Sequence, residues 1–128
     1  MNAAKVVATE PYMLAAFADL SATPELFYPV IRIVEFPLQR IGVGKYDTGF
    51  NMPAVATYSG SLNSYKWDNF LPLVSQAATD DNAEIERTLD MIPEWQWAIL
   101  NEGLFQIPKP YRPGIYPVSL PQDPNVEE

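Results

Sequence analysis

The chain has 128 residues, a formal net charge of −8 and 13 prolines, but no cysteine and no histidine. These two absences exclude disulfides, the usual zinc sites, a cysteine nucleophile and a Ser-His-Asp triad. A hydrophobic share of 48% with 19% charged residues is typical of a globular protein. We therefore expect one domain with one core, in which the prolines favour strands and short helices over long helices.

The negative charge is concentrated in one segment. Residues 67–103 carry eight acidic side chains and a single basic one, Arg87, whereas residues 1–66 carry five of each. An acidic surface repels phosphate groups, so we expect no direct binding to nucleic acid or to an anionic membrane. A solvated face that favours solubility is the simplest explanation.

The N-terminal residues do not fit a secretion signal, because Glu10 and Asp19 interrupt the apolar run that follows Lys5. No stretch approaches the roughly 18 uninterrupted apolar residues of a membrane-spanning helix. We expect synthesis and residence in the cytoplasm.

The first predicted element is a short amphipathic helix from Thr9 to Leu20. Thr9 would be its N-cap, and Pro11 would lie in its first turn. Its apolar side chains share one side at helical spacing: Leu14, Phe17 and Ala18. We expect this helix to pack on a sheet.

The clearest predicted strand covers residues 25–36, which are rich in β-branched and aromatic side chains. Pro29 and Pro37 bracket its apolar part, and prolines at both ends favour an edge strand or a bulge over the middle of a sheet.

Residues 38–43 are expected to form the partner of this strand, followed by a glycine-rich turn. The turn contains GVGK, yet Gln39 stands where a phosphate-binding loop has its first glycine, and Tyr46 stands where it has Ser or Thr. Turn formation explains these glycines, and we expect no nucleotide site and no cofactor.

Residues 54–58 and 62–67 read as two further strands joined by a short turn. Residues 69–78 then place apolar side chains at helical spacing, with Pro72 in the first turn, which predicts a helix.

A third helix is predicted to begin after Asp81 and to end near Met91. Asp81 with Glu84 approximates a capping box. The acidic side chains of residues 80–86 lack the spacing of a calcium loop, so helix capping explains them without a metal.

Residues 94–107 have two interpretations. As a strand, they place Trp95, Trp97 and Ile99 on one face, with Gly103 in the loop of a hairpin. As a helix, they begin after Pro93 and stop at Gly103. The hairpin is the favoured interpretation, and the helix stays open as the alternative.

From residue 108 to residue 128 the periodicity ends and six prolines follow, which predicts an extended arm. The arm is too apolar for a solvated linker, so it should cover a surface of its own domain or of a neighbouring subunit. The residues expected to bind a partner are Pro110, Tyr111, Pro113, Ile115, Tyr116, Val118 and Leu120.

These elements together predict an α+β fold. It would be a small, mainly antiparallel sheet or sandwich with two or three short helices and an extended proline-rich C-terminal arm. Residues 1–107 would form the single globular domain, and residues 108–128 the arm.

No motif connects the chain to a chemistry, and we assign no catalytic, cofactor or metal residues. The favoured hypothesis is a non-enzymatic structural subunit of a larger assembly, specifically a virion component such as a capsid-stabilising or head-to-tail joining protein. It would dock through its arm onto protein partners in a homo- or hetero-oligomer. The alternatives are a carbohydrate-binding module that uses exposed Trp and Tyr, and a histidine-free hydrolase that acts through paired carboxylates.

Overall fold

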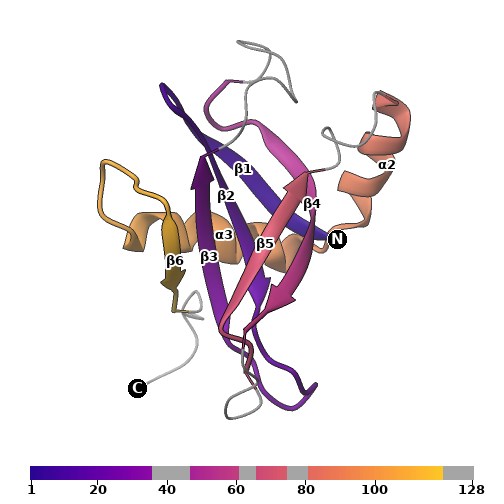
Figure 1. Ribbon diagram of the computed structural model, residues 1–128. Helices are drawn as coiled ribbons and strands as arrows, with labels where there is room; N and C mark the ends of the chain where they lie inside the picture. The colour runs from indigo at the N-terminus through magenta and orange to yellow at the C-terminus, as the bar shows by residue number, and fades with distance from the viewer. Residues whose placement is uncertain (36–46, 61–65, 75–80, 120–128) are drawn as a thin grey trace, which may run out of the picture.

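The computed structural model describes residues 1–35, 47–60, 66–74 and 81–119. In chain order its elements are β1 (Asn2–Thr9), β2 (Tyr12–Asp19), β3 (Pro29–Glu35), β4 (Asn51–Ser59), β5 (Asn69–Val74), α2 (Asn82–Met91), α3 (Glu94–Gln106) and β6 (Gly114–Pro117). The strands form one antiparallel sheet in the order β5-β4-β1-β2-β3-β6 (Figure 1). The predicted α+β class with an antiparallel sheet is confirmed.

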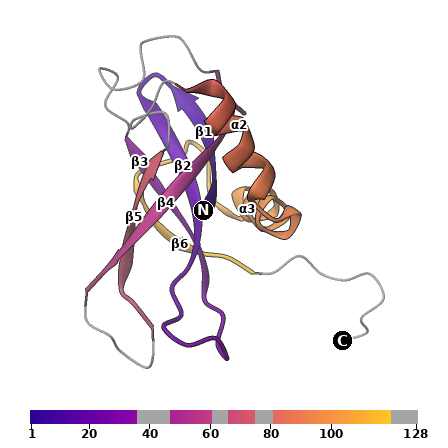
Figure 2. The same cartoon turned by 90° about the vertical axis from the view of Figure 1, so that its right-hand side faces the viewer.

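The sheet curls, and each of its faces builds a core. The concave face encloses side chains from β1 to β5, among them Leu14, Met52 and Phe70. The curl brings β5 back toward β3, where the Arg32 guanidinium donates a hydrogen bond to the Asn69 side-chain oxygen. The opposite face is covered by α3, which lies across the sheet on the side away from β5 (Figure 2).

Residues 12–19 form the strand β2, so the helix predicted from Thr9 to Leu20 is wrong. β2 pairs with β1 on one side and with β3 on the other, and all its residues except Asp19 are buried. A strand that is covered on both faces is apolar without alternation, and such a run also fits one side of a helix. Pairing on both edges decides in favour of the strand.

Residues 69–74 form the edge strand β5, whereas the sequence pattern predicts a helix there. Phe70, Pro72 and Val74 are buried, and they alternate with the exposed Leu71 and Leu73. This period of two belongs to a strand with one covered face. A proline is tolerated because, among the described strands, β5 has a partner on one side only.

The strand predicted at residues 25–36 is present as Pro29–Glu35, but it is not an edge strand. It pairs with β2 and with β6. β4 confirms the strand predicted at residues 54–58 and extends it at both ends. The strand predicted at residues 38–43, and most of the one at residues 62–67, lie outside the described residues.

Helix α2 begins and ends as predicted. The Glu84 backbone N–H donates a hydrogen bond of 3.1 Å to the Asp81 carboxylate, which is the capping contact that the sequence indicates. The helix turns Ile85 and the following Ile92 toward the interior, where both are buried.

Residues 94–106 form helix α3, so the favoured hairpin is wrong. The alternative helix after Pro93 is confirmed, but it continues past Gly103 to Gln106. Gly103 lies inside the helix rather than in a turn. A Cβ atom at Gly103 would lie 2.6 Å from Ile31 Cδ1 and 3.0 Å from Val118 Cγ1. The missing side chain therefore lets α3 approach β3 and the segment that follows β6.

The described part of the proline-rich segment packs on its own domain. Gly114–Pro117 is β6, which extends the sheet beside β3. Val118 is buried in the core under α3, and its backbone N–H donates to the Pro29 carbonyl at 3.1 Å. The projecting arm is not confirmed, and the sheet continues past residue 107, the predicted end of the domain.

Candidate functional site

The residues predicted to bind a partner differ widely in exposure. Pro110 and Pro113 are exposed, Tyr111, Ile115 and Tyr116 are half-buried, Val118 is buried, and Leu120 lies outside the described residues. The Tyr111 hydroxyl donates to the Leu104 carbonyl at 3.4 Å, and the Tyr116 hydroxyl to the Arg112 carbonyl at 2.7 Å. Packing on their own sheet explains their apolar character, and their role in binding a partner stays a prediction.

The outer face of the β4–β5 pair is apolar and exposed. Val55, Leu71 and Leu73 have exposed fractions of 50%, 59% and 48%. In the ladder, Val55 lies opposite Leu73, and Thr57 lies opposite Leu71. Directly opposed side chains on one face are in contact range, so these residues form a continuous patch. We call Val55, Thr57, Leu71 and Leu73 the β4–β5 face.

The β4–β5 face belongs to two strands that contain no charged residue at all. Elsewhere the chain is acidic, and covering a carboxylate costs free energy because the charge loses its water. An apolar face without charges can be covered at no such cost. Continuous apolar patches of this kind mark interaction sites.

The free edge of β5 is less suited to binding than its face. Pro72 lies in the middle of this strand. Prolines in edge strands turn the side that lacks an N–H toward solvent, so a further strand would find a donor missing there. A partner is therefore expected to lie over the face rather than to extend the sheet.

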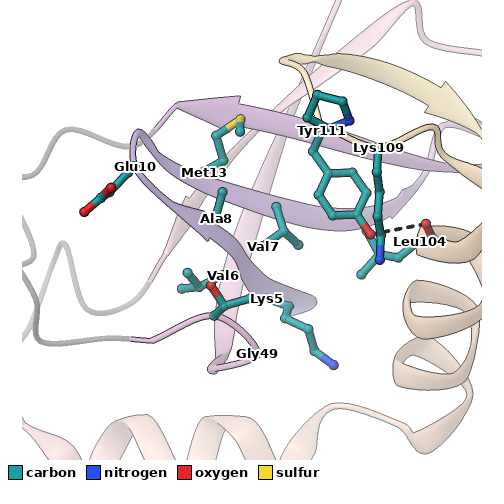
Figure 3. A pocket seen from close by; sticks show the side chains of 12 residues that line it. Lys5, Val6, Val7, Ala8, Glu10, Met13, Gly49, Leu104, Lys109 and Tyr111 are labelled. Atoms are coloured by element: carbon teal, nitrogen blue, oxygen red, sulfur yellow. Dashed lines mark hydrogen bonds between the residues drawn. The ribbon is translucent and has the colours of Figure 1, made fainter.

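A pocket of about 470 Å³ lies between the β1–β2 hairpin, the end of α3 and the segment after α3 (Figure 3). Its apolar lining includes Val7, Ala8, Met13, Leu104 and Tyr111. The register of β1 against β2 shifts between Val6 and Ala8, which marks a β-bulge at Val7. The bulge leaves both Val7 and Ala8 on the side of the sheet that faces α3.

Two lysines line the same pocket. The Lys5 ammonium donates a hydrogen bond to the Asn101 side-chain oxygen, and the Lys109 ammonium lies 5.8 Å from the centre of the Tyr111 ring. Glu10 also lines the pocket, but its carboxylate points away from both lysines in Figure 3. No sequence signal connects Lys5 with Lys109, because the two residues lie far apart in the sequence.

Trp95 is the most exposed of the three tryptophans that the carbohydrate-binding hypothesis considers. It is 50% exposed, whereas Trp67 and Trp97 are partly buried against the two cores. Its ring meets Phe17 edge to face at a centroid distance of 5.8 Å, and Phe27 at 6.1 Å. These contacts hold Trp95 in place at the start of α3.

The described acidic residues do not gather into a group of three that could hold a metal ion. Across the same described ranges, none of the helices combines the length and the apolar composition needed to cross a bilayer.

Tyr58, at the end of β4, carries a perturbed hydroxyl. Its pKa is raised above the usual 10.0, first because burial disfavours the phenolate and then because the Asp19 carboxylate repels it. A hydrogen bond with Asn2 acts in the opposite direction. Tyr58 therefore keeps its proton to higher pH in the folded protein than in the unfolded chain.

We expect this difference to make stability fall in alkali. Below pH 10 both states hold the proton, and above it the unfolded chain loses the proton first, so the free energy of unfolding decreases until the folded-state pKa is passed. Urea unfolding between about pH 8 and about pH 11 should show a shallower decrease for Tyr58→Phe than for the wild type. Parallel pH curves for the two proteins would contradict this assignment.

The fold is shared with a protein of known structure. The chain is similar to the crystal structure of a putative membrane protein from Corynebacterium diphtheriae, with a TM-score of 0.75 and 21% sequence identity. The similarity covers 91% of this chain and 98% of that chain. At this identity it shows a common fold.

A search of the curated proteins finds no match. A family model described as "Protein of unknown function (DUF3239)" matches residues 1–107, which include every element except β6. Because this match spans most of the chain, the protein belongs to the DUF3239 family.

Proposed function

We propose that the protein is a non-enzymatic structural subunit that associates with a second copy of itself through the β4–β5 face. The observation that carries this proposal is the exposure of Val55, Leu71 and Leu73 side by side on two uncharged strands. Covering half of an aliphatic side chain contributes about 1 kcal/mol, so three from each copy contribute several kcal/mol before the cost of association.

Charge decides which face a second copy would use. Two copies that each carry a net charge of −8 repel one another, and the repulsion is strongest where carboxylates would meet. The β4–β5 face brings no carboxylate of its own strands into the contact. A two-fold axis through the face would place Leu71 and Leu73 of one copy against the same patch of the other.

The expected contact is two sheets packed face to face, with Pro72 opposing strand addition. Four side chains make a small interface compared with the roughly 800 Å² per partner of a standard one. We therefore expect a weak dimer, with a dissociation constant on the order of 100 µM. A larger assembly could raise its occupancy by bringing subunits together at high local concentration.

Leu71→Lys should abolish self-association, because it places two like charges in the contact of a symmetric dimer. Sedimentation equilibrium from about 10 µM to about 1 mM should show the wild-type mass rising toward twice that of one chain. The variant should keep the mass of one chain throughout this range.

The matched control is Phe105→Lys. It makes the same change of charge at an apolar side chain that is 82% exposed, but on α3. This control should dimerise like the wild type. A wild-type chain that stays monomeric at about 1 mM, or a Phe105→Lys variant as defective as Leu71→Lys, would refute the proposal.

A further inference from the structure

We infer that the pocket between the β1–β2 hairpin and the end of α3 binds a small amphipathic monocarboxylate. The carboxylate would lie beside the ammonium groups of Lys5 and Lys109, and the apolar body would lie along Val7, Ala8 and Met13. This site is separate from the β4–β5 face, and the two proposals stand or fall independently.

The first argument is the placement of charge. The described part of this acidic chain contains six lysines and arginines, and two of them line one pocket. Lys5 bonds to a neutral amide oxygen and Lys109 lies beside an aromatic ring, and within the described residues neither ammonium has a carboxylate within ion-pair distance. Figure 3 shows both side chains extending toward the α3 end of the pocket. A bound anion would supply the negative charge that neither ammonium group has beside it.

The second argument is the chemistry of the lining. Apart from the two lysines, most of the pocket surface is apolar and comes from aliphatic side chains, a thioether and an aromatic ring: Val7, Ala8, Met13, Leu104, Pro110 and Tyr111. The polar residues Thr48 and Glu10 also line it. Phosphate or sulfate alone would leave this surface in water. A ligand with one anionic end and an apolar body satisfies both ends of the pocket.

The third argument is size. A volume of about 470 Å³ lies in the range of small-molecule sites and corresponds to roughly fifteen water-sized volumes. A monocarboxylate of about ten non-hydrogen atoms fits this space, and its expected dissociation constant is on the order of 1 mM. Octanoate is a suitable probe, and octan-1-ol is its uncharged match.

The walls of the pocket are held by hydrogen bonds within the protein itself. The Gly49 backbone N–H donates to the Val6 carbonyl at 2.7 Å, with Gly49 at a φ of +95° that a glycine adopts without strain. On the other side, the Tyr111 hydroxyl is tied to the end of α3. The pocket therefore exists before a ligand binds, which lowers the cost of binding.

The test is a titration of the full chain with octanoate, followed by the backbone amide shifts in ¹H–¹⁵N NMR spectra. Saturable shifts should appear at Val7, Ala8 and Tyr111. The double variant with Lys5→Gln and Lys109→Gln should weaken octanoate binding at least tenfold, while octan-1-ol, which binds the wild type more weakly, should bind both proteins equally. Ala8→Leu, which fills the apolar part, should weaken both probes.

Lys66→Gln is the matched control for charge. Lys66 lies 5.5 Å from the centre of the Tyr28 ring, so it has an environment like that of Lys109, but it is not part of this pocket. This variant should bind octanoate within twofold of the wild type. Three results would each overturn the inference. The first is an equal loss of octanoate binding in Lys66→Gln, and the second is equal affinity of the wild type for octanoate and octan-1-ol. The third is the absence of shifts at the pocket amides at 10 mM octanoate, about ten times the expected dissociation constant.

Discussion

Truncation of the chain after Ile107 is expected to lower the free energy of unfolding by about 4 kcal/mol. The truncation removes β6, which pairs with β3, and it removes Val118, which is buried under α3. Tyr111, Ile115 and Tyr116, which pack partly against the two cores, are lost as well.

The magnitude follows from burial. A fully buried valine contributes roughly 1.5 to 3 kcal/mol, and each half-buried side chain contributes about 1 kcal/mol before the cost of ordering the segment is subtracted. A domain of this kind has a total stability of about 5 to 15 kcal/mol, so the loss would be a large fraction of it. The cut would also leave β3 as an edge, with unpaired backbone groups beside exposed apolar side chains.

Urea unfolding followed by circular dichroism measures the effect. A chain that ends at Ser119 is the matched control, because it keeps β6 and Val118, and it should be more stable than the chain truncated after Ile107. Equal stability of the chain truncated after Ile107 would show that residues 108–128 are an independent arm after all.

Phe17→Ala is expected to cost about 3 to 5 kcal/mol. Phe17 is 1% exposed on β2, in the core that α3 covers. Its ring contacts Phe27 at 6.3 Å and Trp95 at 5.8 Å between centroids. Removing it leaves a cavity at the point where the first turn of α3 meets the sheet, and Trp95 loses the ring against which it rests.

Two controls separate this effect from a general sensitivity to aromatic residues. Phe105→Ala removes the same side chain from α3 at a position that is 82% exposed, and it should change stability by less than about 0.5 kcal/mol. Phe17→Leu keeps part of the volume and should cost about 1.5 kcal/mol, which keeps the test valid if Phe17→Ala does not fold. Tryptophan fluorescence should change with Phe17→Ala and not with Phe105→Ala. Similar losses at both positions would contradict the described packing of α3.

The elements that could be predicted depend on signals that neighbouring residues supply. Helix α2 is confirmed because Asp81 caps it locally and Ile85 follows at helical spacing. β4 is confirmed as a strand at the predicted position. In both cases the residues that decide the conformation lie within one element.

The errors concern segments whose conformation depends on what covers them. β2 is apolar on both faces, and β5 contains a proline that fits the first turn of a helix as well as an edge strand. For α3, Gly103 suggests a turn, yet the residue is needed for close contact with Ile31. β1 carries no signal strong enough to be predicted, although it lies in the centre of the sheet.

The candidate sites show the same limit. The sequence pattern predicts a helix at residues 69–74, and only a strand places Leu71 and Leu73 together beside Val55, so the β4–β5 face does not follow from the sequence. The pocket brings Lys5 together with Lys109, Pro110 and Tyr111, and the last two were predicted to bind a partner for a different reason, their place in an apolar proline-rich segment.

By itself the sequence determined the broad class of the fold, the capped helix α2 and the exclusion of sites that need histidine or cysteine. These features depend on composition and on local capping, and neither depends on distant residues. Only the tertiary structure decided that β2 and β5 are strands, that Gly103 lies inside a helix, and that the segment after Ile107 completes the sheet. The physical reason is that an apolar segment takes the conformation that buries it best, and the surface available to it is built by residues far away in the chain.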